Sequence, residues 1–546
     1  MSEILTLEYN LAELPSSQHR AGLAGLVLMV RWLKGEPDKK GICEISQIDE
    51  LSATLQINQE GLQYLFDKVY AASSEEKEEG KLRTKKNSDE IIEPIRRGVR
   101  IETDKKGNQK EKPIYTYPQV IPAGAFLADY DKSEEKIWLK LWQRMIWNIL
   151  RGVPATRRPY DERSEGEFTE DADKVWQELN RNADYTVDLP STYFIGAQAS
   201  NAENVLFKDR ARYQFLLHFW SFIAQIYIPL IWVFDRKTQR DTPKDTGYAL
   251  AIPDVARLET FCDELPDILR NRSTEQFVFR PKQSVIDLAA ESGLDFMHKI
   301  NQRLATKVNR QIRDLLLGVD VVHLEKQGNN IRLWGTARID PTPQLIDDYV
   351  RVKERFSNQL YRKQRMLNVL NEEEWFYGFD SLLSTTSTEQ TIGQSFFRND
   401  VRKAFEDIGI SNTSGVQKMN EENYIPSLIY QLVNNYLRAR VDYKFPENKW
   451  RKEWKGESSP QKSKHYELRG KLAREAFLAV RSRTESDFTE YFVSTLCSFP
   501  QFLKQDDYIV LANELHNNSE KVRTMTMLAL SANGYSPKSE SEGEQQ

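Results

Sequence analysis

The sequence predicts an α+β fold, in which a mixed α/β N-terminal body is followed by an α-helical bundle as C-terminal domain. Two observations predict this division. Up to about residue 380, apolar segments with helical spacing, such as residues 137–150, occur together with short β-rich segments, such as residues 248–252. Beyond residue 418, apolar residues recur with helical spacing in one segment after another. The chain of 546 residues is also too long for one ordinary core, so two or three domains are expected.

The first elements of the body follow from their periodicity and caps. A strand comes first, and Ser16 and the residues after it cap an apolar helix at residues 20–33. A second helix is expected at residues 60–70. Residues 73–112 form a polar tract with a turn signal, which predicts a mobile insertion or a hairpin that adds little core.

The centre of the body is predicted from its most apolar segments. In residues 137–150, Trp138, Leu141, Met145 and Ile149 follow helical spacing, which favours a buried helix over a membrane-surface helix. We also expect a core segment at residues 213–234 and short strands at residues 248–252 and 331–334. Helices are expected at residues 294–317 and 345–370.

A segment rich in Ser, Thr, Gly and Asn predicts the domain boundary. We therefore expect a body at residues 1–380, a linker at 381–418, a helical bundle at 419–535 and a disordered tail at 536–546. The helices of the bundle are expected at residues 424–443, 463–480, 488–497, 508–515 and 522–530.

Composition narrows the location of the protein. Cys43, Cys262 and Cys497 lie far apart and in no C-x-x-C pair, which is typical of a reducing compartment such as the cytoplasm. The N-terminus has no secretory signal, and the apolar runs are too short to span a bilayer, so a soluble protein without a membrane partner is expected. A net charge of −5 argues against uniform coating of nucleic acid but permits local binding.

The common enzymatic motifs are absent from the sequence. It has no phosphate-binding P-loop, no G-x-S-x-G nucleophile elbow and no H-E-x-x-H metal helix. The six histidines are isolated, and His218 lies in an apolar run that favours a core histidine. We therefore predict no catalytic residue, no metal and no cofactor, although a site made of carboxylates alone would leave no such motif.

Arginines beside turn-forming residues are candidates for phosphate binding, because the forked guanidinium matches phosphate oxygens and a turn exposes it. Surface ion pairs with the nearby Asp161 and Glu162 are the alternative. The arginines in question are Arg96, Arg97, Arg100, Arg157 and Arg158.

A loop of small and amide residues at residues 194–204 has the side chains needed to read base edges. Small residues let the backbone approach another surface, and each amide offers both a donor and an acceptor. A purely structural loop remains the alternative. The predicted base-reading residues are Gln198, Ser200, Asn201 and Asn204, and the predicted phosphate-binding residues beside them are Lys208, Arg210 and Arg212.

A basic stretch in the helical domain carries a local charge of +8 between residues 438 and 483, with Trp450, Trp454 and Tyr466 interleaved. Cations with aromatic rings between them can hold a nucleic-acid strand by phosphate contact and base stacking. A solvated helix face with a basic linker is the alternative. The predicted strand-binding residues are Arg438, Arg440, Lys449, Arg451, Lys452, Arg469, Arg474, Arg481 and Arg483.

A series of motifs carries a family resemblance over about residues 1–240. The chain resembles the Cas-eight large subunit of Myxan-type, I-B-related CRISPR Cascades, which are type I complexes. The motifs are LPSSQHRAGLAGL at residues 14–26, PAGAFL at 122–127, WLKLW at 138–142, LRGVPATR at 150–157, and GAQ at 196–198 with AEN at 202–204.

The resemblance implies an RNA-guided surveillance complex in which this non-catalytic subunit sits at the foot. There it would recognise the protospacer-adjacent motif in double-stranded DNA, promote duplex opening and stabilise the R-loop, while guide pairing reads the sequence. The implied partners are guide CRISPR RNA, target DNA, the backbone, foot and belly subunits, and either a helicase-nuclease of a defence system or a transposition adaptor. The helical domain would resemble the small belly subunit. A stand-alone carboxylate-metal nuclease and a protein-only scaffold are the competing hypotheses.

The sequence also suggests an internal translation start at Met419. This methionine lies between the expected linker and the first helix of the bundle, so a start there would release a whole domain. The residues before it, 415–418, can be encoded with a purine-rich ribosome-binding sequence. An ordinary linker methionine is the alternative.

Overall fold

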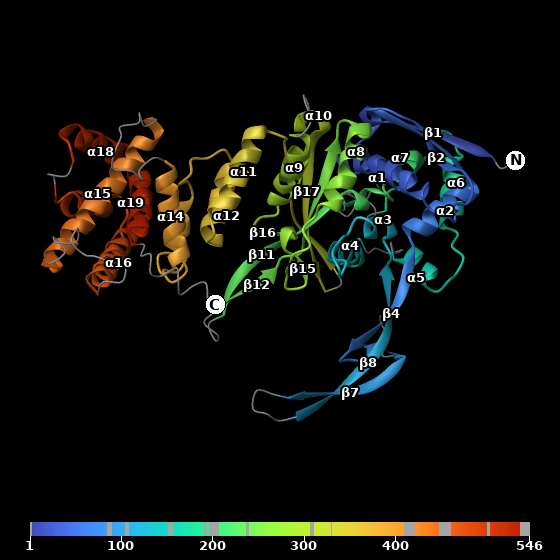
Figure 1. Cartoon of the computed structure of the whole chain (residues 1–546), viewed down its shortest axis with the longest axis horizontal. Helices are drawn as coiled ribbons and strands as arrows, with labels where there is room; N and C mark the ends of the chain where they lie inside the picture. Colours follow the sequence, from blue (N-terminus) through green and yellow to red (C-terminus); the bar gives the residue numbers. More distant parts are fainter. Residues whose placement is uncertain are drawn as a thin grey trace. The chain divides into compact units, whose positions relative to one another are not determined.

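The structure is a computed structural model of the chain (Figure 1). It divides into two compact units, Met1–Pro343 and Gln344–Gln546. The structure describes residues 3–84, 90–103, 109–150, 157–190, 194–195, 207–235, 240–305, 311–328, 330–408, 421–446, 460–499 and 503–534.

The first unit is organised around a six-stranded sheet with the strand order β12-β11-β13-β17-β18, in which β16 also pairs with β11. Neighbouring strands are antiparallel, except that β16 runs parallel to β11. The strands are β11 (Gln225–Asp235), β12 (Arg240–Asp245), β13 (Tyr248–Val255), β16 (Val285–Ile286), β17 (Leu316–Gln327) and β18 (Asn330–Ile339).

The central strand β13 is buried along almost its whole length, because helices cover the sheet. Helices α1 (Ser17–Leu33) and α9 (Glu291–Leu304) both pack against it. Helix α1 also lies close to the segment before β11. A Cβ atom added at Gly22 would lie 2.4 Å from the carbonyl oxygen of Leu216, and one added at Gly25 would lie 2.4 Å from that of Phe219. This close approach of the two backbones therefore requires glycine at both positions.

A smaller antiparallel sheet with the order β1-β3-β2 completes the N-terminal part of this unit. Its strands and the remaining helices and short strands of the unit are β1 (Ile4–Asn10), β2 (Cys43–Ile48), β3 (Ser52–Asn58), α2 (Gln59–Val69), α3 (Ala125–Ala128), α4 (Ile137–Asn148), α5 (Arg158–Ser164), α6 (Asp171–Leu179), β9 (Thr186–Asp188), β10 (Lys208–Arg210), α7 (Ala211–Leu216), α8 (Leu258–Arg270), β14 (Gln276–Phe277), β15 (Arg280–Pro281) and α10 (Ile312–Leu315). Short 3-10 helices cover Leu11–Glu13, Trp220–Phe222 and Lys282–Ser284.

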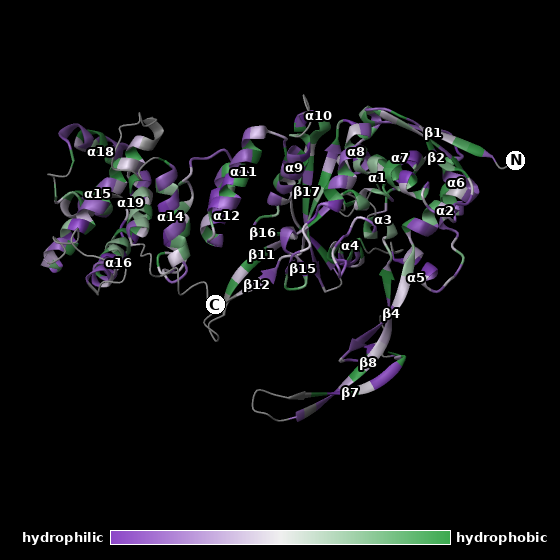
Figure 2. Cartoon of the chain, viewed as in Figure 1, coloured by the Kyte–Doolittle hydropathy of each residue, from purple (hydrophilic) through white to green (hydrophobic). Residues whose placement is uncertain are grey.

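The described residues of the polar tract 73–112 belong to an arm of antiparallel strands that projects from the rest of this unit (Figure 1). Figure 2 shows both hydrophobic and hydrophilic stretches along it. At its base, Tyr117 is fully buried, and the guanidinium of Arg83 lies 4.5 Å from the centre of its ring. The strands of the arm are β4 (Ala72–Glu79), β7 (Arg96–Thr103) and β8 (Gln109–Pro122), with the short pair β5 (Arg83–Thr84) and β6 (Ile91–Ile92).

The second unit is built from helices around a buried central helix, α19. Its own apolar side chains, such as Leu528 and Leu530, are fully buried, and each of the helices α13 to α18 contacts it. The helices are α11 (Pro343–Arg355), α12 (Gln359–Leu370), α13 (Phe379–Thr385), α14 (Ser395–Asp407), α15 (Glu421–Lys444), α16 (Pro460–Arg481), α17 (Glu485–Tyr491), a π-helical turn (Phe492–Leu496), α18 (Gln505–Asn517) and α19 (Ser519–Asn533).

The structure confirms the predicted fold class, a mixed α/β region followed by a helical region. The five helices predicted after residue 418 are all present, and the strands predicted at 248–252 and 331–334 lie within β13 and β18. The helix predicted at 294–317 is wrong at its end, since β17 begins at Leu316. No helix in the described part of the chain combines the length and apolar character needed to cross a membrane.

The division between the compact units lies at residues 343 and 344, before the segment 381–418 that we expected to be a linker. Helix α14 lies inside that segment and packs against α19. Its buried side chains include Phe397, Val401 and Phe405, which supply an apolar face despite the polar composition around them.

Candidate nucleic-acid interface

The loop predicted to read bases is mounted on a short hairpin. Strands β9 and β10 pair antiparallel, with Asp209 opposite Val187, and the backbone N–H of Leu189 donates to the carbonyl of Phe207 at 2.8 Å. The predicted base-reading residues Gln198, Ser200, Asn201 and Asn204 lie outside the described residues. The two described ends of this loop are therefore held together by backbone hydrogen bonds.

A buried histidine fixes the hairpin to α1. The Nε2 atom of His19 lies 2.8 Å from a carboxylate oxygen of Asp209, and its Nδ1 atom lies 2.8 Å from the hydroxyl of Ser16. Only 2% of the His19 side chain is exposed. Ser16 is also the N-cap of α1, as the sequence predicts, so the ring is held at a capped helix end.

The basic residues Lys208 and Arg210 flank Asp209, the residue of β10 that contacts His19. Because successive strand residues point to opposite faces, Asp209 faces His19 while Lys208 and Arg210 are exposed. Arg210 pairs with Asp184 at 3.0 Å and lies over the ring of Tyr213. Arg212, on the first turn of α7, is half-buried. Two of the three predicted phosphate-binding residues therefore present their charge at the surface beside the loop.

The other predicted arginines of the first unit make local contacts. Arg157 donates to the carbonyl of Trp147 at 2.5 Å and lies 4.4 Å from the centre of its ring, whereas Arg158 pairs with Glu162. On the arm, Arg96, Arg97 and Arg100 pair with Glu76, Glu93 and Glu78. Exposed pairs of this kind contribute little stability, so they can exchange a carboxylate for a phosphate.

In the helical unit, three of the predicted strand-binding residues are exposed. Arg438 and Arg440 lie near the end of α15, and Arg474 lies on α16. The guanidinium of Arg440 lies 5.6 Å from the centre of the Tyr436 ring, and Arg474 is 3.8 Å from a carboxylate oxygen of Glu389.

The other described arginines of this set bind oxygen atoms within the unit. Arg469 donates to Asn434 at 2.7 Å and to the carbonyl of Asn533 at 2.9 Å. Arg481 donates to the carbonyls of Ser384 and Thr386 at the C-terminal end of α13, and Arg483 donates to the carbonyl of Ala479. Lys449, Arg451, Lys452 and Met419 lie outside the described residues.

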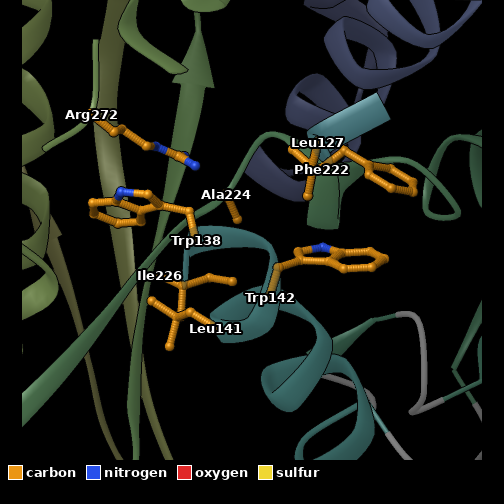
Figure 3. A pocket seen from close by; sticks show the side chains of 8 residues that line it. All are labelled: Leu127, Trp138, Leu141, Trp142, Phe222, Ala224, Ile226 and Arg272. Atoms are coloured by element: carbon orange, nitrogen blue, oxygen red, sulfur yellow. The ribbon is translucent and has the colours of Figure 1, made fainter. Parts of the chain in front are cut away.

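Helix α4 packs into the core as its apolar stripe predicts. Trp138 and Trp142 face Phe222 and the start of β11 around a void of about 10 Å³, which is room for about one water molecule (Figure 3). Arg272 lies at its edge, 4.8 Å from the centre of the Trp138 ring. Burial lowers the pKa of Arg272 to about 10, so it stays charged at neutral pH.

The titratable groups of the described residues give no sign of a metal centre. No three His, Cys, Asp or Glu side chains in those ranges lie together as a metal site requires. His218 is a core histidine, as expected: its Nδ1 atom contacts the Tyr70 hydroxyl, and burial lowers its pKa to about 4.

Comparison with known families decides the identity of the chain. Residues 42–310 match the type I-B CRISPR Cas8b N-terminal domain, and residues 316–533 match the type I-B CRISPR Cas8b C-terminal domain. The chain belongs to the Cas8b family. No curated protein sequence matches it significantly.

As a Cas8b protein, the chain is the large subunit of a type I-B Cascade and assembles with guide RNA and other Cas subunits. The family resemblance drawn from the sequence motifs is therefore confirmed at the level of a type I-B large subunit.

Sequence reasoning did not find the contacts that position the Cas8b loop. His19 and Asp209 are separated by 190 residues, and no local pattern joins them. It also gave no role to Trp334, an exposed tryptophan in β18. The alternation of Arg332 and Trp334 on one face of a predicted strand was the available signal.

We predict that replacing Asp209 with Ala loosens the β9–β10 hairpin. The variant leaves the buried His19 without its carboxylate partner, which costs about 1–3 kcal/mol of the free energy of unfolding. Hydrogen exchange at the amides of β9 and β10 should accelerate. Asp184→Ala, which removes only the exposed partner of Arg210, is the control and should leave exchange in the hairpin unchanged. Equal exchange in Asp209→Ala and wild type would show that the pair is not an anchor.

Proposed function

We propose that this Cas8b chain recognises the protospacer-adjacent motif in double-stranded DNA, promotes duplex opening and stabilises the R-loop without catalysing a reaction itself. In the same complex it provides a docking surface for a helicase-nuclease or a transposition adaptor. The absence of the common enzymatic motifs from the sequence supports a binding role.

The geometry of the β9–β10 hairpin is the observation that carries this proposal. A loop that reads base edges needs fixed ends, because a misplaced amide loses its bidentate geometry. The His19–Asp209 pair and the Leu189–Phe207 hydrogen bond provide such ends. Lys208 and Arg210 are exposed beside them, where phosphate contacts would set the register of the duplex.

The helical unit supports the second part of the proposal, which is retention of an opened strand. Its exposed arginines Arg438, Arg440 and Arg474 are available to phosphates, and the predicted Arg451 and Lys452 add to this charge. Phosphate contact would be independent of sequence, as retention of any displaced or target strand requires.

We predict that replacing Gln198, Asn201 and Asn204 together with Ala relaxes motif preference. The assembled complex should bind a target duplex and a motif-mutant duplex with more similar affinity, because each lost bidentate contact removes about 1–3 kcal/mol of discrimination. The ratio of the two dissociation constants is the measurement.

A matched variant controls for the loss of three amide side chains. Asn182, Asn271 and Gln302 are exposed on the same unit, and replacing them with Ala should leave the ratio unchanged. If the loop variant weakens binding to both duplexes equally, or to neither, the loop is structural.

We predict that the triple variant Arg438→Gln, Arg440→Gln and Arg474→Gln weakens DNA binding without altering motif preference. Each lost phosphate contact lowers the magnitude of the salt slope by about 0.7 to 0.9. Binding titrations at several salt concentrations measure it. Arg351→Gln, at another exposed arginine of this unit, is the control, and an unchanged slope in the triple variant argues against strand contact.

We also propose that Met419 is an internal start, so that free copies of the helical part join the complex. A C-terminal product of residues 419–546 should then appear in the purified wild-type complex by mass spectrometry. Met419→Leu should remove this product and leave the full-length chain. A wild-type complex without the product excludes the internal start.

A further inference from the structure

A cluster of planar side chains lies on one face of the β17–β18 hairpin, outside every site described above. Trp334 is 47% exposed in the middle of β18. The guanidinium carbon of Arg332 lies 3.7 Å from the centre of its ring. The imidazole of His323 on β17 lies 6.4 Å from the same ring and is tilted from it by only 27°. We propose that this cluster is a stacking surface for unpaired bases of single-stranded nucleic acid.

The exposed ring is held in a fixed orientation. The indole N–H of Trp334 donates to Glu325 at 2.9 Å, and the amide of Gln327 donates to the same carboxylate oxygen at 2.9 Å. His323 is fixed in turn, since its Nε2 atom lies 2.7 Å from the carbonyl of Thr246. A ring with its polar atom already satisfied presents aromatic surface alone, and its fixed orientation reduces the entropy lost on binding.

The charges around the cluster suit a polyanion. Arg332 and Lys244 are exposed near it, and Glu325 is the acid between them. Hydrogen bonds from Gln327 and Trp334, together with the nearby cations, lower the pKa of Glu325. The carboxylate therefore stays ionised and keeps the indole oriented, and the two cations Arg332 and Lys244 outnumber it.

Arg338, further along β18, marks the limit of this positive surface. It contacts Asp254 at 2.9 Å and Asp320 at 3.2 Å, so its charge is compensated within the protein. The positive charge that accompanies exposed aromatic surface on this hairpin is thus concentrated at Arg332 and its neighbours.

Unpaired bases are the partner that this chemistry fits. Bases of an intact duplex already stack on one another, whereas a single strand can place a base on an aromatic ring or on a guanidinium plane. A phosphate beside that base would meet Lys244. This inference rests on the nucleic-acid function proposed above. It adds a second contact, on the main sheet, to the one proposed for the motif-reading loop.

The decisive experiment measures binding of the full-length chain to a short oligothymidine, with Trp334→Ala and Trp334→Phe as variants. Trp334→Ala should weaken binding about 5- to 150-fold, the range that corresponds to loss of one base-stacking ring, and Trp334→Phe should retain most of the affinity. An oligonucleotide with abasic sites should bind both variants alike, because it has phosphates but no bases to stack.

Trp232 offers a matched control, because it is 43% exposed on β11. Trp232→Ala should change oligothymidine affinity less than twofold. Arg332→Ala, which removes the guanidinium and keeps the ring, should weaken binding in the same direction as Trp334→Ala. Thermal unfolding of every variant checks that the fold is retained. Equal binding by Trp334→Ala and wild type, or an equal loss in Trp232→Ala, overturns the proposal.

Photocrosslinking in the assembled complex distinguishes the two sources of an unpaired strand. With 5-iodouracil in the guide RNA or in the DNA strands, a crosslink to Trp334 identifies the bound strand. A crosslink to neither strand overturns the proposal, as does protection of Trp334 by a protein subunit. The loop variant tests motif recognition separately, so failure of one proposal leaves the other standing.

Discussion

The first turn of α1 holds two consecutive polar side chains that join separate parts of the first unit. His19 contacts Asp209 on the β9–β10 hairpin, and Arg20 donates to Asp254 on β13 at 2.5 Å. Asp254 also contacts Arg338 on β18, so one carboxylate serves two guanidiniums at 5% exposure. Removing that carboxylate would take from Arg20 its acidic partner, whereas Arg338 would keep its contact with Asp320. Since α1 is close-packed through its glycines, the hairpin and the sheet are held in one geometry.

The compact units of the structure do not coincide with the two family models. The match to the C-terminal domain begins at residue 316, yet β17 lies between β13 and β18 in the sheet of the first unit. Its buried residues Leu316, Val319 and Leu324 belong to that core. A chain cut between the two models would therefore remove two strands from the sheet and expose β13. The two family domains are therefore joined by a shared sheet. The cluster of Trp334, Arg332 and His323 lies on the part of this sheet that the C-terminal model covers.

Local patterns predicted the elements whose residues carry their own signals. Ser16 has the side chain of an N-cap, and the five helices predicted after residue 418 show helical spacing in the sequence. The start of β17 was mistaken for helix because a short apolar run fits both periodicities, and pairing with β13 decides between them. The sequence predicted the loop at residues 194–204 and the basic residues after it, but it did not predict the contact that holds the hairpin beside the loop. Contacts such as His19–Asp209 depend on tertiary packing, which sequence spacing does not encode.

The central helix α19 of the second unit depends on contacts with the helices that precede residue 419. Arg523 on α19 is 8% exposed, and it donates to Asp380 on α13 at 2.6 Å. Arg481 binds the carbonyls of Ser384 and Thr386. Helices α13 and α14 thus neutralise a buried charge and cover the apolar face of α19 together.

A protein that begins at Met419 would lack both of these helices. Arg523 would keep the carbonyl of Arg481 but lose its carboxylate, and a buried guanidinium without a counter-charge is strongly unfavourable. Another surface would therefore have to supply a carboxylate and apolar side chains for α19 and carbonyl oxygens for Arg481. Within a multisubunit complex, a neighbouring subunit is the available source of such a surface. The contacts that α13 and α14 make with α19 therefore define, in chemical terms, the interface that free copies of this domain would need.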